Sequence, residues 1–248
     1  MKTPLMLLAA LAAGASLCAQ SDSPRSSYSV TADFSYTSKY VFRGVQRTRD
    51  ALQPSIDLKI GDPQGGQFYV NAWTSQPLRQ HEHDEADFSA GYRWRLTGEL
   101  SAEVLATYYW YPEANNGETR HSTEGGVGVT YNGGRYLPTA TVYYFYDFDR
   151  QANTGVISFG YGIPIPDLGT QLDLNVYAGT SKADDAFPDS GVTVRESYNY
   201  YGADIELPYR ISQNAKVTVG AHWATNEKYI AGTPRDRFWV DVGVAFGF

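Results

Sequence analysis

Few residues of this sequence have types and spacing that suggest chemistry. The run His81-Glu82-His83-Asp84-Glu85 combines imidazoles and carboxylates, which are ligand types that zinc accepts. The run is short, and the sequence offers no partner cluster, so a solvated acidic loop is the favoured interpretation. Three aspartates could bind calcium, but they lack the spacing of an EF-hand loop: Asp184, Asp185 and Asp189. We therefore expect no metal and no other cofactor.

Catalytic motifs are missing as well. The sequence contains no Gly-x-Ser-x-Gly, no Walker loop and no His-Glu-x-x-His. A barrel phospholipase would need a Ser–His pair on its lipid face, whereas His222 falls between the apolar residues Ala221 and Trp223 and therefore on the opposite face. A hydrolase built from His81 and His83 with Asp84 at a barrel rim is the weakest alternative. We do not expect an enzyme.

The beginning of the chain is expected to be a targeting segment. Lys2 precedes an apolar run over residues 5–13, and small residues follow, so residues 1–19 are predicted to be a cleaved secretory signal peptide. Residues 20–27 are predicted to be a short flexible lead. Cys18, the only cysteine, raises the alternative of a lipid anchor, but Leu17 before it fits that signal poorly. The mature chain would then have no disulfide in an oxidising compartment.

Composition narrows the class of protein further. The net charge of −7 argues against nucleic acid, which requires a basic face. Mean hydropathy is negative, and no apolar run after the signal reaches the roughly 18 residues of a transmembrane helix. The 20 tyrosines, 24 glycines and 15% aromatic residues are instead typical of membrane β-barrels with a wet interior.

Alternation of apolar and polar residues is the dominant pattern. It is clear over residues 28–37 and clearest over 238–248, where apolar residues occupy every second position. Many segments have the length that a tilted strand needs to cross a bilayer, roughly 9–11 residues. We predict about twelve strands, near 28–42, 54–61, 66–75, 86–97, 99–111, 121–132, 137–147, 154–163, 170–180, 197–208, 214–225 and 237–248.

Short and long connections alternate between these segments. The short ones carry turn residues, at 61–65, 97–98, 132–136, 164–169 and 209–213. The long ones are 43–53, 76–85, 112–120, 148–153, 181–196 and 226–236. Short periplasmic turns and long extracellular loops are typical of outer-membrane proteins. We therefore predict an all-β fold, a closed antiparallel transmembrane β-barrel of about twelve strands over residues 28–248. A secreted soluble sandwich or lipocalin-like barrel is the alternative.

Aromatic residues concentrate at the predicted strand ends, as in the girdles at membrane–water interfaces. The upper girdle is expected to include Tyr108, Trp110, Tyr144, Tyr146, Trp223 and Phe238, together with Tyr40, Phe42 and Trp73. Phe246 and Phe248 would belong to the lower girdle. The terminal Phe248 closes an alternating strand and resembles the signal that the barrel-assembly machinery reads.

The polar face supplies candidates for the lining of a pore: Lys39, Arg43, Arg93, Arg95, Glu103, Asp173, Asp204, Glu206 and Asp241. Positive and negative charges nearly balance on this face, which predicts a weak preference for cations. Arg93 and Arg95 with Glu103 could form ion pairs across the lumen or a constriction that filters by charge. Arg43 could line the mouth of a pore or shape the first loop.

A family resemblance supports the same fold. Segment 38–45, which reads Ser-Lys-Tyr-Val-Phe-Arg-Gly-Val, resembles the opening strand of the TorF family of porins. Segments 67–73, 90–94 and 109–112 are also similar to members of that family. The resemblance implies an outer-membrane barrel, but it implies little about the solute and carries no catalytic residues.

These observations together predict a porin-like channel in the outer membrane of a Gram-negative bacterium, for passive diffusion of ions or small polar solutes. Its expected partners are membrane lipid, lipopolysaccharide, the assembly machinery and the solutes. Two alternatives stay open beside the enzyme. Clustered inward aromatics would favour a solute-specific channel for a sugar or a base, with Tyr69, Trp73, Tyr109 and Tyr177 as the candidates. A filled lumen would favour a closed barrel that acts through its loops as an adhesin or receptor.

Overall fold

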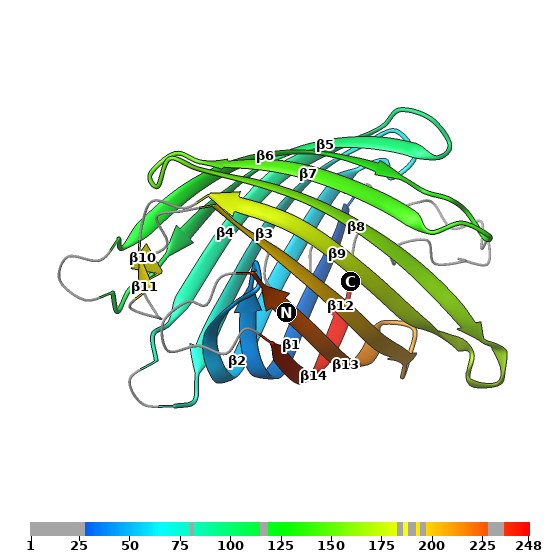
Figure 1. Ribbon diagram of the computed structural model, residues 1–248. Helices are drawn as coiled ribbons and strands as arrows, with labels where there is room; N and C mark the ends of the chain where they lie inside the picture. Colours follow the sequence, from blue (N-terminus) through cyan, green and yellow to red (C-terminus); the bar gives the residue numbers. More distant parts are fainter. Residues whose placement is uncertain are drawn as a thin grey trace.

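The protein is an all-β structure built around one closed antiparallel barrel (Figure 1). The computed structural model describes residues 28–79, 82–114, 119–182, 186–187, 192–193, 197–227 and 236–248. The predicted signal peptide 1–19 and lead 20–27 lie outside the described residues, as do His81, Asp184, Asp185 and Asp189. Within the described ranges, no helix is long and apolar enough to cross a membrane.

Twelve strands form the wall of the barrel. They are β1 (Tyr28–Phe42), β2 (Val45–Gly61), β3 (Gly66–Pro77), β4 (Glu85–Arg95), β5 (Leu100–Trp110), β6 (His121–Tyr131), β7 (Thr139–Asp147), β8 (Ala152–Ile165), β9 (Thr170–Lys182), β12 (Ser197–Arg210), β13 (Ala215–Asn226) and β14 (Arg237–Gly247). Each pairs with its neighbours along the chain, and β14 pairs with β1 to close the ring. The 3-10 helix η1 (Pro166–Leu168) forms one turn, and β10 (Ala186–Phe187) pairs with β11 (Val192–Thr193) apart from the barrel.

The predicted number and order of strands are confirmed, but the first connection is not the expected long loop over residues 43–53. That expectation is wrong, because β1 and β2 are joined by the two-residue turn Arg43–Gly44. Both residues have positive φ, 49° and 72°, as a type I′ hairpin turn requires. The polar run that follows reads as a loop, yet it forms the first part of β2.

The other connections lie at the predicted ends, but their lengths do not all follow the prediction. The connection between β7 and β8, expected to be long over 148–153, has only four residues, whereas the connection between β6 and β7, expected to be short, has seven. We call the end with the short connections, near residues 62–65 and 96–99, the turn end. The opposite end, where β3 joins β4 and β9 joins β12, is the loop end. The first described residue, Tyr28, and the last residue, Phe248, both lie at the turn end.

The two faces of the wall differ in polarity. Outward side chains are apolar and exposed, as for Phe34 at 58%, whereas the next residue, Ser35, points inward and is 5% exposed. The same alternation runs through β6, where Val127 and Val129 are exposed and Glu124 is buried. A soluble barrel would expose polar side chains instead, so this polarity contradicts the soluble alternative. Lipid offers the backbone no hydrogen-bond partners, and a closed ladder with an apolar exterior meets that constraint.

Glycines let inward tyrosines lie flat against the wall. A Cβ atom at Gly202 would stand 2.1 Å from the ring of Tyr177 on β9, and one at Gly179 would stand 2.3 Å from the ring of Tyr200 on β12. Each ring therefore covers a glycine on the neighbouring strand. This packing keeps the bulk of these rings close to the wall.

The outward polarity can be tested in the middle of β6. We predict that Val127→Arg destabilises the barrel folded in lipid vesicles by about 2–4 kcal/mol, because the charged side chain must enter the hydrocarbon. Val127→Leu, which keeps the surface apolar, is the control. Equal folding of both variants, measured by urea titration, would contradict the assignment of this face to lipid.

Candidate functional site

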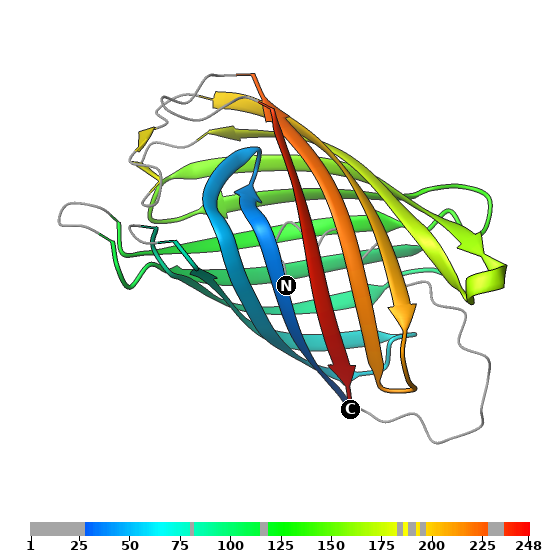
Figure 2. The ribbon, with the colours of Figure 1, turned by 90° about the horizontal axis from the view of Figure 1, so that it is seen from below.

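The joined ends of β1 and β2 bend into the barrel, as the curl of the two blue strands in Figure 2 shows. We call residues 40–48 the tip hairpin. Two irregularities lie where it leaves the wall. The β1–β2 register shifts between Tyr40 and Val41, and Asp50 has a positive φ of 50°. Asp50 is held by the Tyr36 hydroxyl, which donates to Oδ1 over 2.8 Å, and by Arg79. A bulge of this kind bends a strand and re-aims its side chains.

Arg43, at the end of the tip hairpin, reaches the far wall. Its Nη2 atom lies 2.7 Å from Oε1 of Glu124 on β6, and both side chains are buried. The guanidinium carbon also lies 5.2 Å from the ring centroid of Phe145 on β7. In the ring of twelve strands, β7 is six places from β1 in either direction. The tip hairpin therefore spans the full width of the lumen.

The tip hairpin also contacts the wall strands β12 and β13 through Gly44. Asn226 on β13 donates from Nδ2 to the Gly44 carbonyl over 2.7 Å. A Cβ atom at Gly44 would stand 2.6 Å from the Cβ of Tyr200. Position 44 therefore needs glycine twice, for its positive φ and for this close approach.

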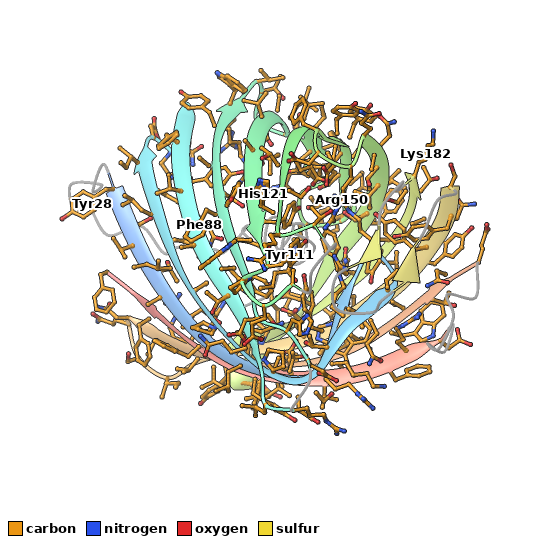
Figure 3. The ribbon with its side chains drawn as sticks, turned by 90° about the vertical axis from the view of Figure 1, so that its left-hand side faces the viewer. Tyr28, Phe88, Tyr111, His121, Arg150 and Lys182 are labelled. Carbon is orange, nitrogen blue, oxygen red and sulfur yellow. The ribbon has the colours of Figure 1, made fainter. Side chains whose placement is uncertain are left out.

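Aromatic side chains pack around the tip hairpin. Phe42 meets Tyr109 edge-on with centroids 6.1 Å apart, and Tyr40 meets Trp73 at 5.4 Å. Tyr111, which follows β5, joins this cluster. Figure 3, which faces the loop end, shows Tyr111 and Arg150 within the ring of strands. The loop-end half of the lumen is thus filled largely by protein.

Arg47 is a second arginine of the tip hairpin, and its charge lies within this filled region. Arg47 is buried, and its positive charge acts on the buried carboxyl groups of Glu85 and Asp87 on β4. The tip hairpin is therefore anchored to opposite charges on two parts of the wall, β4 and β6.

Glu103 on β5 is the centre of another cluster. It accepts hydrogen bonds from the hydroxyls of Tyr69 at 2.5 Å and Tyr143 at 2.8 Å, and Arg93 Nη2 donates to it at 2.7 Å. Arg95 does not join this cluster. It lies at the turn end, where it donates to the Gly98 carbonyl over 2.7 Å.

The remaining pore-lining candidates lie on β9, β12, β14 and β1. His222 bridges Asp204 at 2.8 Å and Asp241 at 2.7 Å, and its ring stacks on Trp239. Asp173, Asp204 and Glu206 line an open cavity of about 810 Å³, together with Arg135. Lys39 on β1 donates to the Phe238 carbonyl over 2.8 Å.

Some of these contacts were not predicted from the sequence. Glu124 was absent from the pore-lining candidates, although alternation within 121–132 places it on the same face as Ser122. Glu85 and Arg47 were missed because one borders a loop and the other follows the turn. The pairing of Arg43 with Glu124 joins residues 81 positions apart, and no local pattern predicts such a contact.

The girdle expectation needs a partial correction. Tyr108, Trp110, Tyr144 and Phe238 point outward and are exposed near the loop end, and Tyr146 and Trp223 are partly exposed. Phe246 and Phe248 are exposed at the turn end. In contrast, Tyr40, Phe42 and Trp73 are buried inside the barrel and cannot meet lipid. Tyr40 and Phe42 belong to the tip hairpin, which turns inward, and Trp73 lies on the inward face of β3 with Tyr69 and Asn71. Their height along the strands was not enough to assign them.

The described part of the chain contains no group of three or more His, Cys, Asp or Glu side chains that could hold a metal ion. Within the run at 81–85, Glu82 instead accepts a hydrogen bond from Arg49 Nε at 3.1 Å. The backbone of Asp84 donates to Glu113 over 3.2 Å. These contacts tie the loop to its neighbours.

The Glu103 cluster gives a test of the interior packing. We predict that Glu103→Ala lowers the free energy of unfolding by about 3 kcal/mol, because Arg93 and two tyrosine hydroxyls lose their shared acceptor. The control is Glu99→Ala in the exposed turn before β5, which should change stability by less than about 0.5 kcal/mol. Denaturant titration in micelles measures both, and equal values would show that the cluster contributes no net stability.

Comparisons with known proteins identify the family of this chain and solved structures that share its fold. A search of the curated proteins finds no match. Among solved structures, the fold is similar to the KdgM porin (TM-score 0.55, 11% identity, 88% of this chain and 99% of that chain). It is also similar to the NanC porin (0.55, 9%, 88% and 98%) and to an outer membrane channel from Pseudomonas putida F1 (0.50, 9%, 92% and 100%). At these identities the likeness shows the fold. Residues 21–176 match a family described as a bacterial protein of unknown function, Gcw_chp, and the chain therefore belongs to the Gcw_chp family.

Proposed function

We propose that the protein is a channel for passive diffusion of ions and small polar solutes across the outer membrane of a Gram-negative bacterium. The observation that carries this proposal is the closed barrel with an apolar exterior and a polar interior that opens into a cavity of about 810 Å³. The porins and channels that share the fold support it. The expected signal peptide 1–19 provides the export that this location requires.

The charges of the interior support a weak preference for cations. Two of the arginines, Arg43 and Arg93, are neutralised by Glu124 and Glu103. Among the described residues that line the cavity, three carry a carboxyl group (Asp173, Asp204 and Glu206) and one, Arg135, carries a guanidinium. A cavity lined by an excess of one charge raises the local concentration of the opposite ion.

A closed barrel that acts through its loops is the second candidate function. The tip hairpin supports it, since residues 40–48 cross the lumen and pack against the far wall. The aromatic residues named for a sugar or base track support that reading less. Tyr69 is engaged by Glu103, and Trp73 and Tyr109 pack against the tip hairpin. We propose no enzyme activity.

The exterior supports the proposed partners. Outward apolar side chains such as Phe34, Val127 and Phe238 would contact lipid, and the loop end would face lipopolysaccharide. The terminal Phe248 is exposed at the turn end, while its backbone pairs with Val30 at 3.1 and 2.9 Å. Its ring is thus accessible for the assembly machinery.

Single-channel conductance in a planar bilayer tests the proposal. We expect small, discrete current steps from the refolded protein, because ions can pass only beside the tip hairpin. A salt gradient should give a reversal potential of the sign for weak cation preference. A correctly folded barrel that carries no current would favour the loop-acting alternative.

A double variant tests whether the current passes through the cavity. Asp173→Asn with Glu206→Gln should move the reversal potential toward anion preference, because the variant removes two negative charges from the lining. Glu227→Gln is the control at the loop end, where the Glu227 carboxylate accepts hydrogen bonds from Asn199 and Tyr201. An unchanged reversal potential in the double variant would place the ion path elsewhere.

A further inference from the structure

The far-wall contact of the tip hairpin has the composition of a site for an organic cation. The Glu124 carboxylate is buried and receives both Arg43 at 2.7 Å and the Tyr109 hydroxyl at 3.1 Å. The Phe145 ring lies 5.2 Å from the guanidinium carbon. A buried carboxylate beside an aromatic face is the combination that binds guanidinium and ammonium groups, through charge-assisted hydrogen bonds and cation–π attraction.

The Arg43 guanidinium, which belongs to the protein itself, fills this site, while the residues that surround it come from both the tip hairpin and the wall. Phe42 packs against the guanidinium from the side of the tip hairpin, with its centroid 4.6 Å away. Glu124, Tyr109 and Phe145 belong to the wall strands β6, β5 and β7. These three wall residues would stay in place if the tip hairpin moved away.

The charge of the buried Glu124 carboxylate determines which kind of solute could replace Arg43. A buried carboxylate without a partner is strongly unfavourable, so the tip hairpin cannot leave Glu124 without compensation. A neutral or anionic solute offers none. A soluble cation restores the pair, so the exchange of one cation for another costs little.

The exchange requires the tip hairpin to move, and two irregularities of the backbone lie where such a movement would bend the chain. The register shift at Tyr40/Val41 on β1 and the positive φ of Asp50 on β2 lie where the tip hairpin leaves the wall. Motion about these two points would carry Arg43 away from β6 without breaking the ladder between β1 and β14, which involves residues 31–37 of β1.

We propose that Glu124, Tyr109 and Phe145 form a luminal binding site for solutes with a guanidinium or primary ammonium group, which Arg43 occupies as a tethered ligand and plug. This inference rests on the proposed channel function, since it names the class of solute that the lumen recognises. Because tethering gives Arg43 an effective concentration of millimolar or higher, free cations compete weakly in the wild-type protein and bind readily once Arg43 is removed.

The test uses Arg43→Ala in the full-length protein, with methylguanidinium as the probe and methylurea as its neutral analogue. Saturation-transfer NMR in micelles measures binding, and planar bilayers measure current. We expect methylguanidinium to bind Arg43→Ala at least about tenfold more tightly than the wild type, and also more tightly than Arg43→Ala/Glu124→Gln. Arg43→Ala/Asp241→Asn is the matched control, because Asp241 is another buried carboxylate but lies on β14, across the ring from β7. It should bind like Arg43→Ala.

The two readouts separate this inference from the channel itself. Arg43→Ala should conduct more than the wild type, and methylguanidinium should reduce that current while methylurea does not. Binding that depends on Glu124 in a protein without current would sustain the cation site and overturn the channel. Current without Glu124-dependent binding would overturn the cation site and leave the channel intact. Heat-modifiable mobility on gels confirms that each variant is folded, and Arg43→Lys, which keeps a cation on the tether, should stay as weak a binder as the wild type.

Discussion

Closure of the hydrogen-bond ladder is the constraint on which the rest of the structure depends. Every backbone group in a lipid environment needs a partner within the protein, so the first strand must pair with the last. Here Thr31 faces Gly247 and Thr37 faces Asp241 across the seam between β1 and β14. Once twelve strands close, their number and tilt fix the width of the interior. Everything inside must fit that width.

The interior of this barrel combines polarity with crowding. Charged groups there are paired across strands, as in Arg93 with Glu103 and His222 between Asp204 and Asp241. The tip hairpin then adds a segment of backbone to the loop-end half. The result is an asymmetric lumen, filled toward the loops and hollow toward the turns, where the cavity lies. In the proposed channel, a few side chains at one level of the barrel would therefore control passage.

Most of the wall could be predicted from the sequence because its information is local. Alternation identifies both the strands and their outward faces, and turn residues mark the short connections. Prediction failed where alternation is broken. The register shift at Tyr40/Val41 and the positive φ of Asp50 change the direction of the chain, so Phe42 points inward although its height suggested a lipid girdle. Which charges meet, such as Arg43 with Glu124, depends on curvature summed over six strands, and no short window of sequence contains that information.

The position of the tip hairpin in the chain has a consequence for assembly. Strands β1 to β7 are consecutive both in sequence and in the ring. The wall residues that Arg43 contacts, Glu124 and Phe145, therefore belong to the first seven strands of the chain. Contacts of Gly44 with Asn226 and Tyr200 must wait for the strands that follow. Both charged partners are thus synthesised before the strands that close the seam, and the region that matches the family, residues 21–176, contains both of them.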